Sequence, residues 1–230
     1  ADIGLATDGD ADRIGAVDAL GNYVDPHHIM ALSLRYLVEK RGWDGAVVKT
    51  VSTTLMMNRL AKKYDLPIHE TPVGFDQIAE LMMNENVLIG GEESGGISIK
   101  GHIPEGDGVL MGLLLLELLA DAGVPLHELI NDLQQSVGPT CYRRSDIKLD
   151  TPIPKAQMVE QLANRAPEKI NHETIVDINT SDGIKFMMAD DSWLLIRPSG
   201  TEPVLRVYSE AADEEAVANI LAAGQTMAGL

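Results

Sequence analysis

The sequence predicts a three-layer α/β domain with a mostly parallel sheet, followed by a smaller α+β domain with an antiparallel sheet. Two observations support this fold class. Short apolar strand patterns alternate with helix patterns over the first two thirds of the chain, which is typical of parallel strands joined by crossover helices. After about residue 140, several strand patterns follow one another directly, which is typical of an antiparallel sheet.

The elements of the first region follow from apolar spacing and from turn residues. An apolar strand opens the chain, and residues 14–25 predict a hairpin that turns at Leu20-Gly21-Asn22. Helices are predicted where apolar residues recur every three or four positions, and strands where short apolar runs end at turn residues. The predicted helices cover residues 29–40, 54–64, 76–84, 109–122 and 125–137, and the predicted strands cover 46–48, 66–68 and 87–89.

The pattern changes near Gly138-Pro139. Beyond that point the predicted strands cover residues 142–149, 175–178, 184–188, 193–196 and 205–209, and the predicted helices cover 155–164 and 213–227. We therefore place a domain boundary at about residue 140. Because the chain opens directly on an apolar strand with no lead-in, we expect its first residues to belong to a domain that begins upstream. Residues 1–25 are the closing strands of a truncated α/β domain, residues 26–139 form an α/β domain, and residues 140–230 form an α+β domain.

Composition excludes several kinds of partner. The 230 residues contain 35 Asp and Glu against 18 Lys and Arg, a formal charge of −17, so the surface repels nucleic acid and anionic lipid. The longest apolar run, residues 109–116, is too short to span a bilayer, which predicts no membrane partner. Cys141 is the only cysteine, which excludes an intrachain disulfide and suits a reducing, cytoplasmic location.

The first candidate site is an acidic loop. Asp8, Asp10 and Asp12 alternate with small residues, and three carboxylates in such a loop can converge on one hard divalent cation. An EF-hand begins in the same way, but it needs Gly and Glu where this sequence has Arg13 and Ala19. A solvated acidic turn is the alternative. Because three acids in one tight turn repel each other, a bound cation is the better explanation.

The second candidate site is the glycine-rich segment 90–96, Gly-Gly-Glu-Glu-Ser-Gly-Gly, directly after an apolar strand. Ligands of parallel sheets bind at the carboxyl ends of strands, and Glu92 and Ser94 offer acceptors and a donor for sugar hydroxyls. A flexible glycine-rich turn is the alternative. The loop at Gly74 is a similar but weaker feature, and His102 either faces this site or lies on the surface.

The third candidate site is the segment 197–203, Arg-Pro-Ser-Gly-Thr-Glu-Pro, between two predicted strands. Arg197 and Arg206 supply cations, Ser199 and Thr201 supply hydroxyls, and Gly200 leaves the backbone N–H groups accessible. Together these groups form a nest for a phosphate dianion. A hairpin turn with incidental polar residues is the alternative, but so many donors in a chain poor in cations favour anion binding.

These three motifs, in this order, resemble the α-D-phosphohexomutases, the phosphoglucomutase/phosphomannomutase group. Segment 8–13 resembles the magnesium loop of that family, segment 90–96 its sugar-specificity loop, and segment 197–203 its C-terminal phosphate-binding loop. The resemblance extends over the whole chain. It implies that the chain holds the end of the second of four domains, which carries the metal loop, a sugar-binding third domain and a phosphate-binding fourth domain.

The resemblance implies an interconversion of hexose 1-phosphate and hexose 6-phosphate, of glucose and/or mannose, through a phosphoserine and a bisphosphorylated sugar. It implies that Mg²⁺ is held by Asp8, Asp10 and Asp12, and that Arg13 and Lys49 act catalytically near the transferring phosphate. Hexose 1,6-bisphosphate is the implied activator of the intact enzyme. The predicted substrate-binding residues are Gly74, Glu92, Ser94, His102, Arg197, Ser199, Gly200, Thr201 and Arg206.

Two features depart from the family pattern. The Ser-His motif that carries the phosphoserine has no counterpart in these residues, so the chain alone is expected to be inactive and to need the missing N-terminal domains as its partner. Asp76 stands where the family often has Lys. Two other interpretations remain: a non-catalytic module that binds sugar phosphate and Mg²⁺, and a haloacid-dehalogenase-type phosphatase, whose pattern lacks the sugar loop and the phosphate nest.

Overall fold

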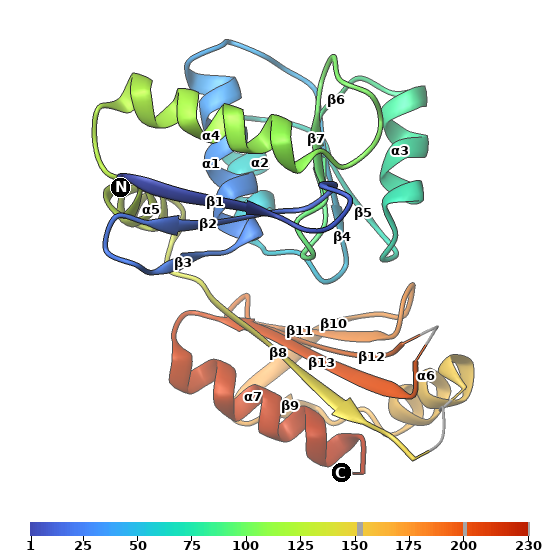
Figure 1. The fold of residues 1–230 in the computed structure, drawn as a ribbon. Helices are drawn as coiled ribbons and strands as arrows, with labels where there is room; N and C mark the ends of the chain where they lie inside the picture. The colour runs from blue at the N-terminus through green and yellow to red at the C-terminus, as the bar shows by residue number, and fades with distance from the viewer. Residues whose placement is uncertain (151–153, 200–201, 230) are drawn as a thin grey trace. The chain divides into compact units, whose positions relative to one another are not determined.

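The computed structural model describes residues 1–150, 154–199 and 202–229. The chain forms two units, Ala1–Gly138 and Pro139–Leu230 (Figure 1). Residues 1–25 belong to the first unit together with the α/β region that follows them. The assignment of residues 1–25 to a separate, truncated domain therefore stays a prediction.

The sheet of the first unit has the strand order β5-β4-β6-β7. Strands β4 (Ala46–Thr50), β5 (Ile68–Thr71) and β6 (Val87–Gly91) are parallel, and the short β7 (Ile97–Ile99) is antiparallel to β6. All residues of β4 and β6 are buried, as expected of parallel strands that are covered on both faces. The mostly parallel sheet predicted from the sequence is confirmed.

Helices cover both faces of this sheet. On one face, Val47 belongs to a core shared with α1 (Pro26–Glu39) and α2 (Met56–Lys63). On the other face, Val48 packs with Ile78 of α3 (Phe75–Asn84). Successive residues of a strand point to opposite faces, so this division follows from the period of the strand. The result is the predicted three-layer arrangement.

Two further helices complete the first unit, α4 (Gly108–Ala122) and α5 (Leu126–Val137). Leu115 of α4 and Leu133 of α5 are fully buried in the core of the unit. Among the described residues, no single helix has both the length and the apolar character to cross a membrane. Helices α4 and α5 have the length and apolar composition of a membrane span only when taken together, and the pair is bent by 86° at the break between them.

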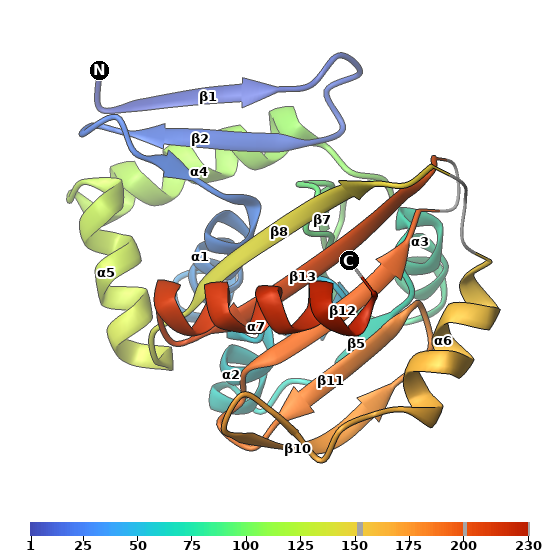
Figure 2. The same cartoon turned by 90° about the horizontal axis from the view of Figure 1, so that it is seen from below.

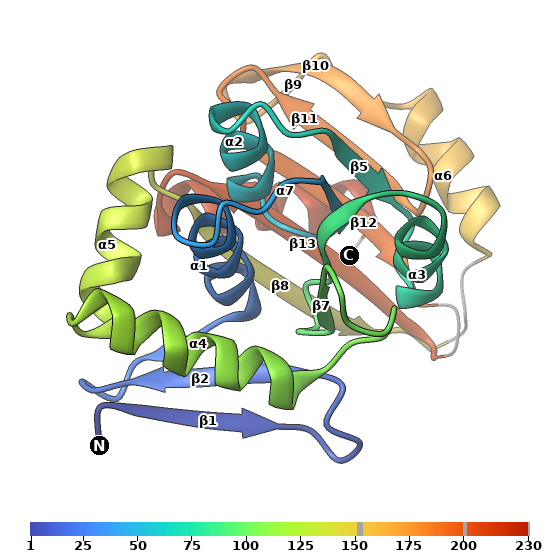
Figure 3. The same cartoon turned by 90° about the horizontal axis from the view of Figure 1, so that it is seen from above.

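The first three strands form a small antiparallel sheet, β1 (Ile3–Thr7), β2 (Ile14–Asp18) and β3 (Tyr23–Val24). Figure 3 shows this sheet lying along α4, and its contacts with that helix are direct. Ile14, Ala16 and Val24 enter the core of the first unit, whereas most of β1 is exposed. The predicted hairpin is confirmed, and Asp18 Oδ1 closes it by accepting the backbone N–H groups of Leu20 and Asn22, both at 2.8 Å.

The second unit is a six-stranded antiparallel sheet with the order β8-β13-β12-β11-β10-β9. The strands are β8 (Cys141–Lys148), β9 (Lys169–Ile170), β10 (Glu173–Asn179), β11 (Ile184–Met188), β12 (Trp193–Pro198) and β13 (Val204–Ala211). Figure 2 shows α7 (Glu214–Met227) crossing one face of this sheet, and α6 (Lys155–Asn164) contacts β11. Phe186, Leu194 and Val207 form the core beneath these helices.

Each unit holds one of the two tryptophans. In the first unit, the guanidinium carbon of Arg41 lies 5.5 Å from the ring centroid of Trp43. In the second, Nζ of Lys185 lies 4.7 Å from the ring centroid of Trp193 on β12. The two indole rings therefore report on different parts of the chain.

Candidate functional site

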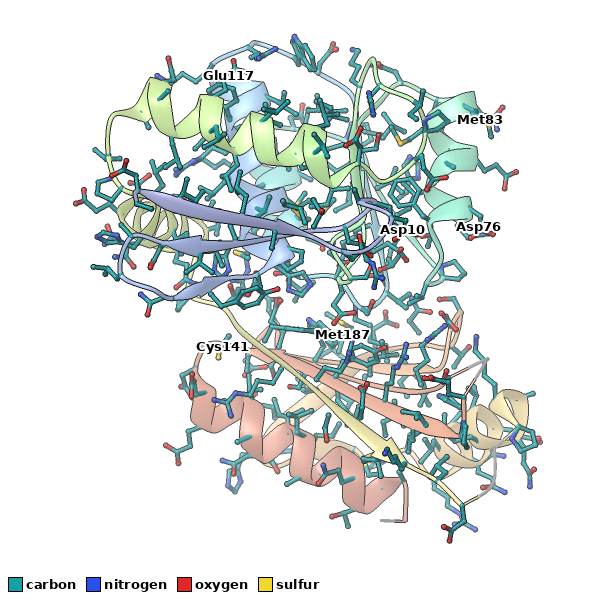
Figure 4. The ribbon with its side chains drawn as sticks, viewed as in Figure 1. Asp10, Asp76, Met83, Glu117, Cys141 and Met187 are labelled. Atoms are coloured by element: carbon teal, nitrogen blue, oxygen red, sulfur yellow. The ribbon has the colours of Figure 1, made fainter. Side chains whose placement is uncertain are left out.

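The acidic loop between β1 and β2 gathers its carboxylates as predicted. One oxygen from each of Asp8, Asp10 and Asp12 lies within 4.8 Å of the others, and Figure 4 shows Asp10 in this loop. Arg13 Nε donates to Asp8 Oδ2 at 2.5 Å and lies 3.5 Å from Asp12 Oδ1. Ala11 takes a left-handed backbone conformation, φ 62°, which bends the loop around its own side chains.

The electrostatics of this loop are unbalanced. Desolvation and the neighbouring carboxylates Asp8 and Asp10 raise the pKa of Asp12. For Asp8, desolvation raises the pKa, but the hydrogen bonds with Arg13 and Asp12 and the charge of Arg13 together lower it. Within the described residues, Asp12 Oδ1 is buried without a hydrogen-bond partner. One arginine cannot neutralise three carboxylates. The clustered hard oxygens, of which Asp12 Oδ1 accepts no hydrogen bond from the described residues, fit a divalent cation such as Mg²⁺.

Backbone pairing joins the acidic loop to the glycine-rich loop. Ile14 N–H donates to Gly95 O at 3.2 Å, and Arg13 and Gly96 form an antiparallel bridge. Gly95 has φ +104°, and a Cβ at that position would lie 2.7 Å from Ile14 O. A side chain at residue 95 would therefore separate the two loops. The structure brings the predicted metal residues and the predicted sugar loop side by side.

Glu92 is the centre of the glycine-rich loop. Its Oε1 accepts the backbone N–H of Gly74 at 2.9 Å, which brings the loop after β5 to the loop after β6. Desolvation raises the pKa of Glu92, the bonds from Gly74 and Ser94 lower it, and the charges of Glu93 and Asp76 raise it further. Asp76 lies at the start of α3 (Figure 4). The predicted residues Gly74, Glu92 and Ser94 are thus brought together at the carboxyl ends of the strands.

Lys49 lies at the same edge of the sheet and is buried. Its ammonium group lies 3.0 Å from Glu70 Oε2 on β5 and donates to Thr53 O at 3.1 Å. In register, Lys49 lies opposite Gly91, the last residue of β6. The lysine predicted to be catalytic therefore lies on the strand next to the one that leads into the glycine-rich loop. The sequence did not indicate its carboxylate partner, Glu70.

His102 follows strand β7. Strand β7 runs back along β6, with Ile99 opposite Ile89, so the backbone that follows β7 lies at the amino end of β6. The His102 ring is hydrogen-bonded to Asp107, with 2.9 Å between Nε2 and Oδ2, and Asp107 caps α4. The contact of the His102 ring is therefore with Asp107, whose own N–H donates to Ile97 O at 3.1 Å, directly after the glycine-rich loop. A role for His102 in substrate binding stays a prediction.

In the second unit, Arg197 and Arg206 lie directly opposite each other on β12 and β13. Like charges at such positions destabilise a sheet unless carboxylates compensate them. Arg197 Nε donates to Asp182 Oδ2 at 2.8 Å, and Arg206 lies 3.8 Å from both Asp146 and Glu202. The structure thus concentrates cations here and surrounds them with acids.

The loop after Arg197 is partly described. Ser199 N–H donates to Val204 O at 2.8 Å, and Ser199 Oγ accepts the N–H of Glu202 at 3.3 Å. These bonds place the Ser199 hydroxyl at the end of the β12–β13 hairpin, next to the paired arginines. Gly200 and Thr201, also predicted to bind phosphate, lie outside the described residues.

Three carboxylates beside these sites were not predicted from the sequence, and one of them, Asp146, lies 3.8 Å from Arg206. Glu70 pairs with Lys49, and Asp182 pairs with Arg197. Nothing near Glu70 in the sequence marks it, because its partner comes from a neighbouring strand. Asp182 carries a usable signal, because it stands in Ser181-Asp182-Gly183 between two strands and Asp-Gly is typical of a hairpin turn.

Two family models match the chain. Residues 25–137 match the phosphoglucomutase/phosphomannomutase α/β/α domain III, and residues 148–223 match the phosphoglucomutase/phosphomannomutase C-terminal domain. The fold is that of a sugar-phosphate mutase. The chain belongs to the phosphoglucomutase/phosphomannomutase family, that is, to the α-D-phosphohexomutases.

Individual relatives agree with this family. The chain is 32% identical to a phosphoglucomutase/phosphomannomutase of Thermococcus kodakarensis over 97% of this chain and 46% of that protein. It is 35% identical to a phosphoglucosamine mutase of Methanococcus aeolicus over 96% of this chain and 47% of that protein. The crystal structure of Paramecium parafusin, a phosphoglucomutase, superposes with a TM-score of 0.80 at 25% identity, covering 99% of this chain and 45% of that one. The chain therefore spans about half the length of the relatives it matches.

Proposed function

We propose that this chain is the metal-, sugar- and phosphate-holding part of a phosphohexomutase that interconverts hexose 1-phosphate and hexose 6-phosphate, of glucose and/or mannose. The observation that carries the proposal is the pairing of Ile14 N–H with Gly95 O, together with the bridge between Arg13 and Gly96. This pairing joins the loop of three clustered carboxylates to the loop that carries Glu92, the residue that we propose binds the sugar. Neither loop alone defines such a reaction.

The acidic loop has the ligands for Mg²⁺. Asp8, Asp10 and Asp12 would hold the ion, and a bound Mg²⁺ offsets the negative charge of a phosphoryl group under transfer. Arg13 is anchored to Asp8 through Nε, and its remaining N–H groups can bind phosphate oxygens. Lys49 adds a second fixed cation near the carboxyl edge of the sheet. We assign catalytic roles to Arg13 and Lys49 on this basis.

The other two loops would hold the substrate. Glu92 and Ser94 orient the sugar by accepting from and donating to its hydroxyls, with the Gly74 N–H holding Glu92 in place. Arg197, Ser199 and Arg206, with Gly200 and Thr201, would bind the phosphate that is not being transferred. Phosphoryl transfer in the family passes through a phosphoserine, which in the intact protein would come from N-terminal domains outside this sequence. Hexose 1,6-bisphosphate would be the activator there.

A mutase assay tests this proposal. We expect the intact protein to convert glucose 1-phosphate to glucose 6-phosphate with Mg²⁺ and catalytic glucose 1,6-bisphosphate, and we expect this chain alone to be inactive. Binding of glucose 1-phosphate and Mg²⁺ without turnover by the intact protein would instead identify a non-catalytic binding module. Turnover by the chain alone would require a nucleophile within these residues. We also propose the cytoplasm as its location, on the ground of the single cysteine.

A further inference from the structure

Asp182 is a buried carboxylate that links two cations of the second unit. It lies in the turn between β10 and β11, and its side chain is 1% exposed. Arg197 Nε donates to its Oδ2 at 2.8 Å, and Lys155 Nζ, at the start of α6, forms an ion pair with its Oδ1. A carboxylate so deeply buried needs such partners, because desolvation of an unpaired charge is costly.

The turn is also fitted against the backbone that carries Arg197. Gly183 has φ +89°, and a Cβ there would lie 2.6 Å from Ile196 O and 3.0 Å from Arg197 Cβ. Ile184 pairs with Ile196 across the β11–β12 ladder, which fixes the turn directly beside Arg197. The position of the Asp182 carboxylate is therefore fixed by a turn that packs against the backbone of Arg197.

The geometry points to Asp182 as the positioning residue for Arg197 in the phosphate site, an inference that rests on the proposed function. The bond to Asp182 uses Nε, and a guanidinium carries four more N–H groups on its two terminal nitrogens for a phosphate. Holding a long side chain in its binding rotamer before the ligand arrives lowers the entropic cost of binding. Lys155 shares the carboxylate, so the cluster keeps a net charge of +1.

A positioning role for Asp182 predicts a change in anion affinity of opposite sign to the change that charge alone predicts. Asp182 is a negative charge beside a phosphate site, so its neutralisation should tighten anion binding if only charge mattered. If Asp182 positions Arg197, its neutralisation should weaken binding, because the guanidinium loses its anchor. The sign of the effect therefore separates the two roles.

The first experiment is a calorimetric titration of the chain with glucose 1-phosphate. Asp182→Asn is expected to raise Kd by about tenfold, as expected when a preorganised charged bond is lost. Asp177→Asn, which removes the same charge from an exposed position on β10, should change Kd by less than about twofold. An unchanged or lower Kd for Asp182→Asn would overturn the inference.

A double-mutant cycle tests whether Asp182 acts through Arg197. In the Arg197→Ala background, Asp182→Asn should produce no further loss of affinity, because its effect depends on the arginine. An equal additional loss would mean that Asp182 acts independently, which contradicts a positioning role. A general structural defect would likewise lower affinity in both backgrounds.

A measurement on the unaltered chain covers the case in which Asp182→Asn fails to fold. NMR exchange rates of the arginine Nε–H groups, without ligand, should show Arg197 strongly protected relative to exposed Arg165. Equally fast exchange would show that Arg197 is not held and would overturn the inference. If Arg197→Ala itself leaves Kd unchanged, the phosphate site fails as well. If Arg197→Ala weakens binding and Asp182→Asn does not, only the positioning role fails.

Discussion

The acidic loop of the first unit and the arginine pair of the second unit manage charge in opposite ways. In the loop, three carboxylates share one arginine, and Asp12 keeps a buried oxygen without a hydrogen-bond partner among the described residues. Around the arginine pair, Asp182, Asp146 and Glu202 accompany the two guanidinium groups. The loop has an excess of negative charge, whereas each guanidinium of the arginine pair has carboxylates beside it.

This difference follows from the composition of the chain. With 35 acidic and 18 basic side chains, cations are scarce, and the two arginines that face each other on β12 and β13 have carboxylates beside them. A cation site therefore needs only clustered carboxylates and a ligand from solution. An anion site needs cations whose partners leave donors available. A guanidinium that is bound through one nitrogen keeps the N–H groups of its other two nitrogens for an anion. The following predictions test this contrast between the two sites.

The largest expected effect concerns the junction that the acidic loop depends on. Gly95→Ala should lower the free energy of unfolding of the first unit by about 3 kcal/mol, because the new Cβ meets Ile14 O and the φ of +104° is strained for alanine. Urea denaturation followed by circular dichroism measures this loss. Gly9→Ala is the matched control, since a Cβ there meets no atom within 4 Å. Equal stability of the two variants would contradict the close approach.

The next effect concerns the arginine pair. Arg197→Ala should weaken glucose 1-phosphate binding by about 2 kcal/mol, roughly 30-fold in Kd, because a charged hydrogen-bond donor is lost. In the intact protein the same change should mainly raise KM. Isothermal titration measures the affinity, with Arg165→Ala as the control. If the two variants bind alike, the segment after β12 is only a turn.

A smaller effect concerns the cation of the acidic loop. Asp8→Asn/Asp10→Asn should weaken Mg²⁺ binding by at least about tenfold, because ligand charge is removed from the cluster. Calorimetric titration with MgCl₂ tests this. The control Asp177→Asn/Asp190→Asn removes equal charge far along the sequence, in the second unit. Equal Mg²⁺ affinity in both double variants would show that net charge, not the loop, attracts the ion.

The smallest effect is a pH dependence at Glu92. The pKa of Glu92 is raised in the folded protein, so the folded state binds the carboxyl proton more tightly than the unfolded state does. Ionisation of Glu92 therefore lowers the free energy of unfolding at a pH above the folded pKa, and it has no such effect at a pH below the ordinary pKa of glutamate. Glu92→Gln should therefore raise the free energy of unfolding at pH 7, by less than about 1 kcal/mol, and raise it less at pH 4. Glu80→Gln, at an exposed position of α3, is the matched control. A gain that is independent of pH would contradict the assignment.

The sequence predicted most elements because their signals are local. The apolar run of β4, the hairpin turn at Leu20-Gly21-Asn22 and the long helix α4 all lie where the patterns indicate. Strands β7 and β9, with three and two residues, are too short to carry a periodic signal, and β5 begins at Ile68 rather than residue 66. Their position is set by pairing with distant strands.

The candidate sites likewise combine features that are local in the sequence with features that are not. The residue types of the three loops could be predicted, because metal, sugar and phosphate binding each need a compact motif. The bridge from Arg13 to Gly96 and the ion pairs of Lys49 with Glu70 and of Arg197 with Asp182 could not. Each joins residues brought together by tertiary structure. The position of His102 in the sequence does not show which residue its ring contacts, and in the structure that residue is Asp107.

The distribution of the two tryptophans has a practical consequence. Trp43 lies in the first unit and Trp193 in the second, so replacing either with Phe leaves one intrinsic fluorophore that reports on a single unit. Emission from Trp43 in a Trp193→Phe background would follow the unfolding of the unit that carries the acidic loop. Emission from Trp193 in a Trp43→Phe background would follow the unit that carries the arginine pair. Fluorescence can thus assign each stability change to its own unit without an extrinsic dye.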